Sequence, residues 1–252
     1  MISHFFEKNI HMREVIKGAS TAFVQKGVGA LMAFAMNLLL ARELGASGVG
    51  LYYHAITVVA MACTFRNMGI GSALLKFVSI AAAAKDYAQV SGLYRKGVLI
   101  VLLSSVVCFV VVYTSSNWLA ERLFHEKELG KILRIAAFAI LPLTLATIHA
   151  QLLQSIKRVG FSLFIQVSCV PVVMLVLLVL SFNKIGPTTA IIFYLLGTLA
   201  AVMAGVLLWH YFMPLVRVTK GAFSGKTLLA TSIPLLMVSS AFLINSWTDT
   251  IM

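Results

Sequence analysis

Residues 92–114 have the sequence GLYRKGVLIVLLSSVVCFVVVYT, in which the only charged residues, Arg95 and Lys96, lie near the start. A helix of about 20 apolar residues is long enough to cross the hydrocarbon core of a bilayer. On a water-soluble domain the same run would expose a large apolar patch to solvent. The stretch therefore predicts a transmembrane helix.

The whole chain has the same apolar character. Of its 252 residues, 60% are hydrophobic and 11% are charged, and the mean hydropathy is +0.97. A soluble domain has about 45–50% apolar and about 25% charged residues. The composition excludes a soluble enzyme, a disordered chain, a disulfide-stapled secreted domain and a DNA-binding module. The predicted fold class is all-α, a polytopic bundle of transmembrane helices.

Seven apolar spans divide the chain into segments. Residues 1–17 contain no continuous apolar core, so we expect a cytoplasmic N-terminal segment rather than a cleavable signal peptide. Residues 18–213 are expected to form a six-helix lobe, residues 214–227 a cytoplasmic linker, and residues 228–252 the seventh helix, which begins a second lobe. The expected spans are 18–41, 49–65 with a continuation to 80, 92–114, 132–154, 161–182, 188–213 and 228–250.

The basic residues orient these spans. Twelve of the 20 Lys and Arg residues fall in one set of alternate polar breaks, and six fall in the other. Because the more basic loops of a membrane protein stay in the cytoplasm, we expect the N-terminus inside. The net charge of +12 then needs no nucleic-acid partner.

Prolines and aromatic residues occupy particular positions in the spans. Pro142, Pro171 and Pro234 each remove a backbone donor, and we expect each to kink its helix, either as a hinge or as a passive feature. Tyrosines and tryptophans near span ends suggest an aromatic belt at the membrane interface. They are Tyr52, Tyr53, Tyr94, Tyr113, Trp209, Tyr211 and Trp247.

Lys26 and Arg66 are the two cations inside predicted spans. A charged side chain is costly in the bilayer core, so both are candidates for a functional role. Small and polar residues form a narrow stripe along the helix of Lys26: Ala22, Lys26, Ala30, Ala33 and Asn37. Such a stripe either packs tightly on a neighbouring helix or lines a wet cavity, and the lysine favours the cavity.

Arg66 lies on a second stripe of small residues, with Ala55, Val59 and Ala62 on the same face. It either lines a cavity or reaches the lipid headgroups from a helix end. The glycines Gly69 and Gly71, which follow it, are expected to loosen the helix before the continuation to residue 80.

Neutral polar residues cluster on one face of the fourth expected span. Thr144, Thr147 and Gln151 share this face, and Gln154 lies beside them. Each alone is more typical of a hydrogen bond to a neighbouring helix or to its own backbone. As a set opposite Lys26 and Arg66, they would form a polar, net cationic chamber suited to an anionic headgroup.

No pattern typical of an enzyme is found in the spans. Catalysis in the membrane needs carboxylates, a metal cluster or a nucleophile–base pair, and the only acid in a span is Asp249 in the seventh. The three cysteines lie in apolar runs without metal-site or disulfide spacing, and no phosphate-binding loop is present. We therefore expect no enzyme activity, no cofactor and no metal, and we take Asp249 as a candidate for ion coupling.

Several tracts resemble the polysaccharide flippases, the O-antigen-type translocases of the multidrug/oligosaccharidyl-lipid/polysaccharide exporter superfamily. The resemblance covers the whole chain as an ordered set of spans. It is carried by LLARELG (39–45), GVGLY (48–52), NMGIGSAL (67–74) and Phe77, and later by SIPL (232–235) and WTDTIM (247–252). Asn67 departs from the family, which often has an acid before the glycine, and this weakens proton coupling at that position.

The resemblance implies a V-shaped bundle of two six-helix lobes around a cationic cavity in a bacterial inner membrane. It implies that an oligosaccharide on a polyprenyl diphosphate is moved from the cytoplasmic to the outer leaflet by alternating access. Lys26 and Arg66 fit the family's habit of placing cations in this cavity, and Asn37 and Gln151 complete the set expected to contact substrate. Membrane lipids are expected partners, and polysaccharide polymerase and glycosyltransferases are the expected protein partners.

Family members have twelve or more spans, whereas this sequence ends at Met252 as the second lobe begins. We therefore expect a fragment, or a chain that pairs with another polypeptide. Two other functions are kept open. A cation-coupled multidrug exporter of the same superfamily prefers acids in the membrane, for which Asp249 is the one candidate. A non-transporting scaffold for polysaccharide assembly enzymes is the other.

Overall fold

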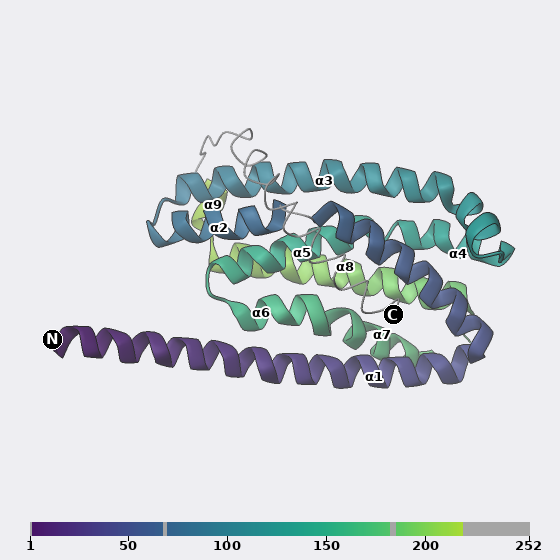
Figure 1. Ribbon diagram of the computed structural model, residues 1–252, viewed down its shortest axis with the longest axis horizontal. Helices are drawn as coiled ribbons and strands as arrows, with labels where there is room; N and C mark the ends of the chain where they lie inside the picture. The colour runs from purple at the N-terminus through teal and green to yellow at the C-terminus, as the bar shows by residue number, and fades with distance from the viewer. Residues whose placement is uncertain (1, 68–69, 182–184, 219–252) are drawn as a thin grey trace.

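The computed structural model describes residues 2–67, 70–181 and 185–218, which form helices and no strand (Figure 1). The all-α prediction is confirmed for these residues. The elements η1 and η2 are short π-helical segments. In chain order the helices are α1 (Ile2–Asn67), α2 (Ile70–Ala83), α3 (Tyr87–Trp118), η1 (Leu119–Leu123), α4 (Lys127–Ala137), α5 (Ile140–Ser155), α6 (Val159–Leu163), η2 (Phe164–Ser168), α7 (Cys169–Leu180), α8 (Pro187–Phe212) and α9 (Leu215–Val218).

The longest element, α1, consists of two helical arms that meet at Gly45. This residue has φ 65° and ψ 177°, a conformation that favours glycine because it has no Cβ atom. The first arm runs from the N-terminus to the bend, and the second arm runs back along the bundle (Figure 1). The predicted spans 18–41 and 49–65 lie on the two arms, and the predicted polar break lies at the bend.

Four helical stretches are long and apolar enough to cross a bilayer: Gly18–Thr64, Tyr87–Leu123, Val159–Leu180 and Pro187–Phe212. Helices α4 and α5, which meet at 44°, make a fifth if they are taken as one span. The predicted spans 92–114, 132–154, 161–182 and 188–213 fall on these helices. The predicted span 228–250, with Asp249, and residues 219–227 of the predicted linker lie outside the described residues. The grouping into lobes stays a prediction.

The kinks predicted at two prolines coincide with breaks in helical order. Pro142 has no N–H to donate to the carbonyl of Phe138, and α4 ends one residue before Phe138. The 44° bend between α4 and α5 follows from this break. Pro171 comes shortly after η2, where the chain is wound as a π-helix. Pro234 lies outside the described residues.

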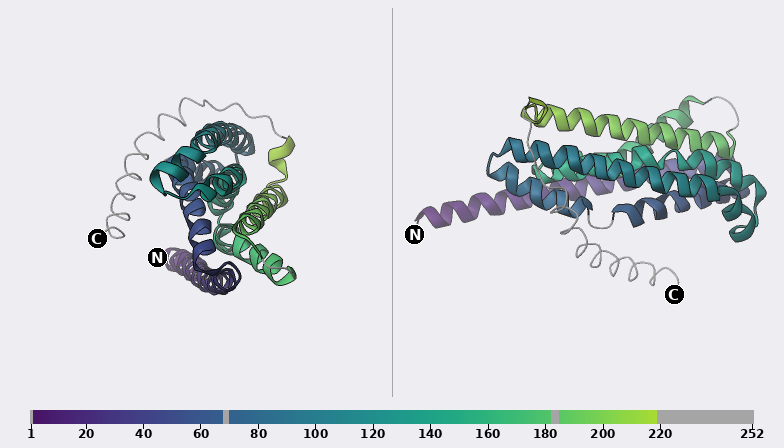
Figure 2. Two further views of the ribbon diagram at one scale, coloured as in Figure 1. Left: turned by 90° about the vertical axis from the view of Figure 1, so that its right-hand side faces the viewer. Right: turned by 90° about the horizontal axis from the view of Figure 1, so that it is seen from above.

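Helix α5 packs against α2, α3 and α8, and glycines allow some of the closest helix contacts in the bundle. A Cβ atom on Gly205 of α8 would lie 2.8 Å from the Cβ of His149 on α5. One on Gly97 of α3 would lie 2.6 Å from Leu74 of α2. Because lipid is as apolar as leucine, such close packing holds membrane helices together. Figure 2 shows most helices end-on in one view and lengthwise in the other, as expected for one aligned bundle.

The predicted aromatic belt is wrong for two of its members. Tyr52 is 2% exposed and Trp209 is fully buried, so both belong to the protein interior. Tyr53, Tyr113 and Tyr211 are exposed, as a belt requires, and Trp247 lies outside the described residues. Proximity to a span end fixes the depth of a residue, but not whether it faces lipid or protein.

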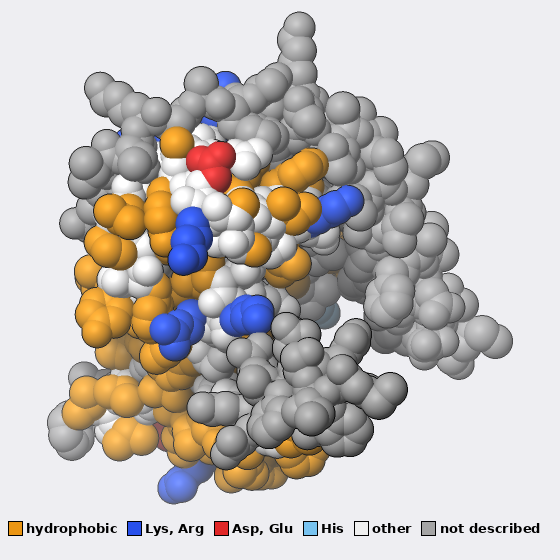
Figure 3. Space-filling view, turned by 90° about the vertical axis from the view of Figure 1, so that its left-hand side faces the viewer, with side chains coloured by type: hydrophobic (Ala, Val, Ile, Leu, Met, Phe, Trp, Pro, Cys, Tyr) orange, Lys and Arg blue, Asp and Glu red, His pale blue; other side chains and the backbone are white. Residues whose placement is uncertain are grey.

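Charged residues gather at the two ends of the bundle. The end on the left of Figure 1 has exposed cations in the α2–α3 turn, in early α3 and in the α5–α6 turn, and Asp86 is the one acid among the side chains described there (Figure 3). Its cations include Lys85, Arg95, Lys96, Lys157 and Arg158. The opposite end mixes cations with the acids Glu43, Glu121, Glu126 and Glu128. Among the described side chains, the left end is therefore the more basic.

Candidate functional site

The two arms of α1 are tied together by a hydrogen bond. The Tyr53 hydroxyl on the second arm donates to Oδ1 of Asn37 on the first arm, at 2.6 Å. Both residues line a pocket of about 310 Å³, together with Gln166 of η2 and Tyr194 of α8. Asn37, predicted to contact substrate, is exposed and borders a pocket whose lining is mostly apolar.

This hydrogen bond, called the tie below, fixes how the two arms of α1 are aligned, and so the relative positions of Lys26 and Arg66 along them. Lys26 lies eleven residues before Asn37, and Arg66 lies thirteen residues after Tyr53. At 1.5 Å per helical residue, these separations correspond to about 16 Å and about 20 Å along the arms. Because the two arms run in opposite directions (Figure 1), helix positions 26 and 66 lie on the same side of the tie, at comparable distances from it along their arms. The side chain of Arg66 is outside the described part of the chain.

The stripe of Lys26 flanks the packed face of the first arm. The packed face is defined by Gln25, whose Nε2 donates to Ser168 Oγ at 3.0 Å, and by Gly29, where a Cβ would lie 2.5 Å from Val167. Lys26 and Asn37 are exposed beside this face. Among the described residues, the stripe is therefore not the surface on which the arm packs.

The face predicted for Arg66 is different. Ala55 and Val59 are fully buried and belong to the main hydrophobic core of the bundle. This part of the second stripe packs against neighbouring helices, and it lines none of the described pockets. Small side chains on this stripe are thus explained by helix packing.

The two threonines of the fourth expected span bond to their own helix. Thr144 Oγ1 donates to the Leu141 carbonyl at 2.8 Å, and Thr147 Oγ1 donates to the Leu143 carbonyl at 2.8 Å. Both hydroxyl protons are therefore donated within α5. Hydrogen bonding to their own backbone is one of the roles expected for each threonine alone.

Gln151 has an unusual environment at the contact between α5 and α2. Its side chain lies directly against Gly71, and a Cβ on this glycine would overlap the Gln151 amide. Oε1 of Gln151 is buried and accepts no hydrogen bond from the described residues. Because Gly71 follows Arg66 by five residues, Gln151 lies next to the part of the chain where the second arm of α1 gives way to α2.

A partly buried aromatic–histidine cluster, not predicted from the sequence, joins three helices. Tyr94 of α3 stacks on Trp209 of α8, with ring centroids 5.5 Å apart. Nδ1 of His149, on α5, lies 2.7 Å from the Leu145 carbonyl oxygen. Nε2 of the same ring lies 3.3 Å from the Tyr94 hydroxyl oxygen. A carbonyl only accepts, so Nδ1 carries the proton and Nε2 accepts from Tyr94. His149, a histidine within an apolar span, is the one sequence signal for this cluster.

The predicted site residues do not share one enclosed pocket in the described part of the chain. Lys26 and Asn37 lie on the exposed flank of α1, whereas Gln151 lies at the α2–α5 contact. Asp249 lies outside the described residues. In the described ranges, no group of three or more His, Cys, Asp or Glu residues is placed to hold a metal ion.

The described residues form an all-helical bundle with several apolar helices of spanning length, which indicates a multi-pass membrane protein. The chain belongs to the polysaccharide biosynthesis protein family, whose model matches residues 15–252. Members of this family are typically transporters rather than enzymes. No match was found among curated proteins or among solved structures.

Proposed function

We propose that this chain forms the N-terminal lobe and seventh helix of a flippase for polyprenyl-diphosphate-linked oligosaccharide. In this proposal the substrate moves from the cytoplasmic to the outer leaflet of a bacterial inner membrane by alternating access. The observation that supports the proposal is the Asn37–Tyr53 hydrogen bond, because helix positions 26 and 66 lie on the same side of it on the two arms of α1. Family membership supports a role in polysaccharide synthesis.

The chemistry of the tied hairpin suits a diphosphate with attached sugars. Lys26 is exposed on α1 and can donate charge-assisted hydrogen bonds, which are stronger in a low-dielectric site than in water. Because Oδ1 of Asn37 accepts from Tyr53, the amide N–H groups of Asn37 are oriented away from that bond and can donate to phosphate or sugar oxygens. The side chain of Gln151 is not part of this hairpin, because its Oε1 is buried at the α2–α5 contact.

The proposed orientation places the more basic end of the bundle in the cytoplasm. That end has the α2–α3 and α5–α6 turns, and the N-terminal arm of α1 extends from it (Figure 1). The acids near η1 and α4 would then lie on the outer side. The bends at Gly45 and before Pro142 supply positions where the lobe can flex as access alternates.

The proposal is tested by Lys26→Ala and Arg66→Ala in the intact protein, expressed in cells that lack the native gene. Each variant is expected to lose surface polymer without a fall in protein abundance. A charge-assisted hydrogen bond is worth about 1.5–3 kcal/mol, so each loss corresponds to roughly tenfold or more in affinity. Arg122→Ala removes an exposed cation from η1 at the opposite end and is expected to keep normal polymer levels.

Retained polymer in both Lys26→Ala and Arg66→Ala would contradict the assignment of these cations to the substrate path. Co-purification of glycosyltransferases with unchanged lipid-linked sugars would support a scaffold instead. Increased drug sensitivity in cells without the gene, with normal surface polymer, would support a multidrug exporter.

A further inference from the structure

A groove of about 860 Å³ lies between the first arm of α1, the α6–η2 segment and α8. We call it the α1–α8 groove, and it is lined on the α1 side by Thr21 and Gln25. Gln25 and Lys26 are successive residues, about 100° apart around the helix. The groove therefore opens on a different flank of α1 from the stripe of Lys26 and Asn37.

The walls of the α1–α8 groove are apolar and face the surroundings of the bundle. Phe161 is 44% exposed, Phe164 is 37% exposed and Leu207 is 65% exposed. In a bilayer, side chains of this kind contact acyl chains. The volume lies in the range of about 300–1,000 Å³ that is typical of small-molecule sites in proteins.

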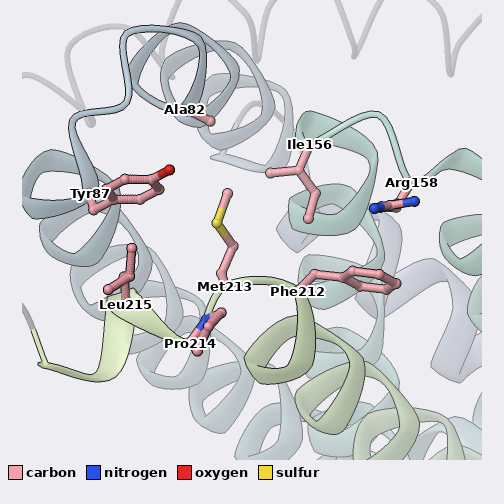
Figure 4. Close-up of a pocket in the computed structure, with 8 residues that line it drawn as sticks. All are labelled: Ala82, Tyr87, Ile156, Arg158, Phe212, Met213, Pro214 and Leu215. Carbon is pink, nitrogen blue, oxygen red and sulfur yellow. The ribbon is translucent and has the colours of Figure 1, made fainter.

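Two successive cations lie at one end of this apolar groove. Lys157 and Arg158 occupy the turn between α5 and α6, and both are exposed. The Arg158 guanidinium lies over the Phe212 ring, 4.5 Å from its centroid (Figure 4). This cation–π contact restricts the arginine before any ligand arrives, which lowers the entropy cost of binding. Arg158 also borders a second pocket of about 280 Å³ beside Met213 (Figure 4).

We propose that the α1–α8 groove binds an anionic phospholipid of the surrounding bilayer, with an acyl chain against Phe161, Phe164 and Leu207 and the phosphate held by Lys157 and Arg158. The charge of the two cations is complementary to the phosphate, and the apolar walls fit the chain. Basic pockets between membrane helices on the cytoplasmic side recognise anionic headgroups in this way. The site is separate from the proposed transport path, because it lies on another flank of α1. Only its assignment to the cytoplasmic leaflet rests on the orientation given under the proposed function.

The test measures lipid binding to the intact purified chain in detergent by native mass spectrometry. Dioleoyl phosphatidylglycerol is titrated against dioleoyl phosphatidylcholine, which has the same chains and no net charge. We expect tighter binding of phosphatidylglycerol. In Lys157→Gln/Arg158→Gln this preference should fall roughly 25-fold, at about fivefold for each cation near an anionic headgroup.

The matched control is Lys85→Gln/Arg95→Gln. It removes two exposed cations from the same end of the bundle. Lys85 also matches Lys157 in backbone conformation, because φ is 56° at Lys85 and 62° at Lys157. This control should keep the preference for phosphatidylglycerol. Because Arg158→Gln also removes the contact with Phe212, Lys157→Gln alone is measured as a second variant, with an expected loss of about fivefold.

Three results would overturn the proposal. The first is an equal loss of preference in the groove variants and the control, because that indicates general surface electrostatics. The second is displacement of phosphatidylglycerol by the same concentration of inorganic phosphate, because that indicates a free-anion site. The third is displacement by a lower concentration of polyprenyl phosphate, because that assigns the groove to the transported class of lipid. None of these readouts depends on transport, so failure here and failure of the flippase proposal are distinguishable.

Discussion

Glycine residues decide how closely the helices of this bundle approach. The α5–α8 contact is the clearest case, because Gly205 faces the Cβ of His149, an atom that cannot move without the backbone. The same contact keeps His149 within reach of Tyr94 and places α8 so that Trp209 stacks on Tyr94. Gly50, on the second arm of α1, has no atom within 4 Å of an added Cβ and so provides a comparison.

Gly205→Ala is expected to destabilise the protein by about 1–3 kcal/mol, because overpacking a tight contact forces the backbones apart. Gly50→Ala should be neutral or stabilise by up to about 1 kcal/mol, since alanine favours the helix. Unfolding of the purified variants in SDS micelles measures both free energies. Equal stability of the two variants would show that the α5–α8 approach is not limited by Gly205.

At the residue scale, the sequence predicts which side chains share a helix face but not what that face meets. The stripes of Lys26 and Arg66 have the same pattern of small residues on a helical wheel. One is exposed beside the packed face of α1, and the other includes the fully buried Ala55 and Val59. Thr144 and Thr147 share a polar face in the sequence, and both donate to their own backbone, which is one of the roles more typical of each residue alone.

At the scale of elements, the sequence predicts most of the helical pattern, because local chemistry determines it. The bend at Gly45 and the break before Pro142 follow from backbone conformations that those residues favour or forbid. The contact between Asn37 and Tyr53 could not be predicted, because it depends on the angle at which the two arms return. That hydrogen bond is nevertheless the feature that defines the register of the candidate site.

A double-mutant cycle measures the strength of this tie. Tyr53→Phe and Asn37→Ala each remove one side of the hydrogen bond, and we expect a coupling energy of about 0.6 kcal/mol, typical of interhelical hydrogen bonds in membranes. Both single variants should lower transport, because the tie positions the two arms. The combination Tyr113→Phe with Asn37→Ala is the control, since Tyr113 lies on α3. A coupling energy of zero between positions 37 and 53 would show that this hydrogen bond does not fix the alignment of the two arms.

At the scale of the whole molecule, charge separates the two ends of the bundle more clearly than hydropathy does. Acids are concentrated near η1 and α4, whereas the α2–α3 and α5–α6 turns are mainly basic. The sequence predicts this asymmetry from loop counts alone. It cannot predict the cluster of Tyr94, His149 and Trp209 or the α1–α8 groove, because both arise where residues distant in the chain meet.

The orientation is tested with single cysteines at exposed positions of the two ends. In a background without native cysteines, Arg122→Cys should react with an impermeant maleimide on spheroplasts. Lys85→Cys should react only after lysis, because the basic end is expected in the cytoplasm. The opposite pattern of labelling would place the N-terminus outside and contradict the proposed direction of transport.

The central claim, movement of lipid-linked oligosaccharide across the membrane, is tested most directly by the lipids of cells that lack the gene. Cells are labelled with radioactive sugars, and the polyprenyl-linked oligosaccharides in their lipid extracts are compared with those of wild-type cells. We expect these lipids to accumulate while surface polymer is lost, because synthesis continues on the cytoplasmic side without export. Wild-type levels of lipid-linked oligosaccharide in the deleted cells would contradict it.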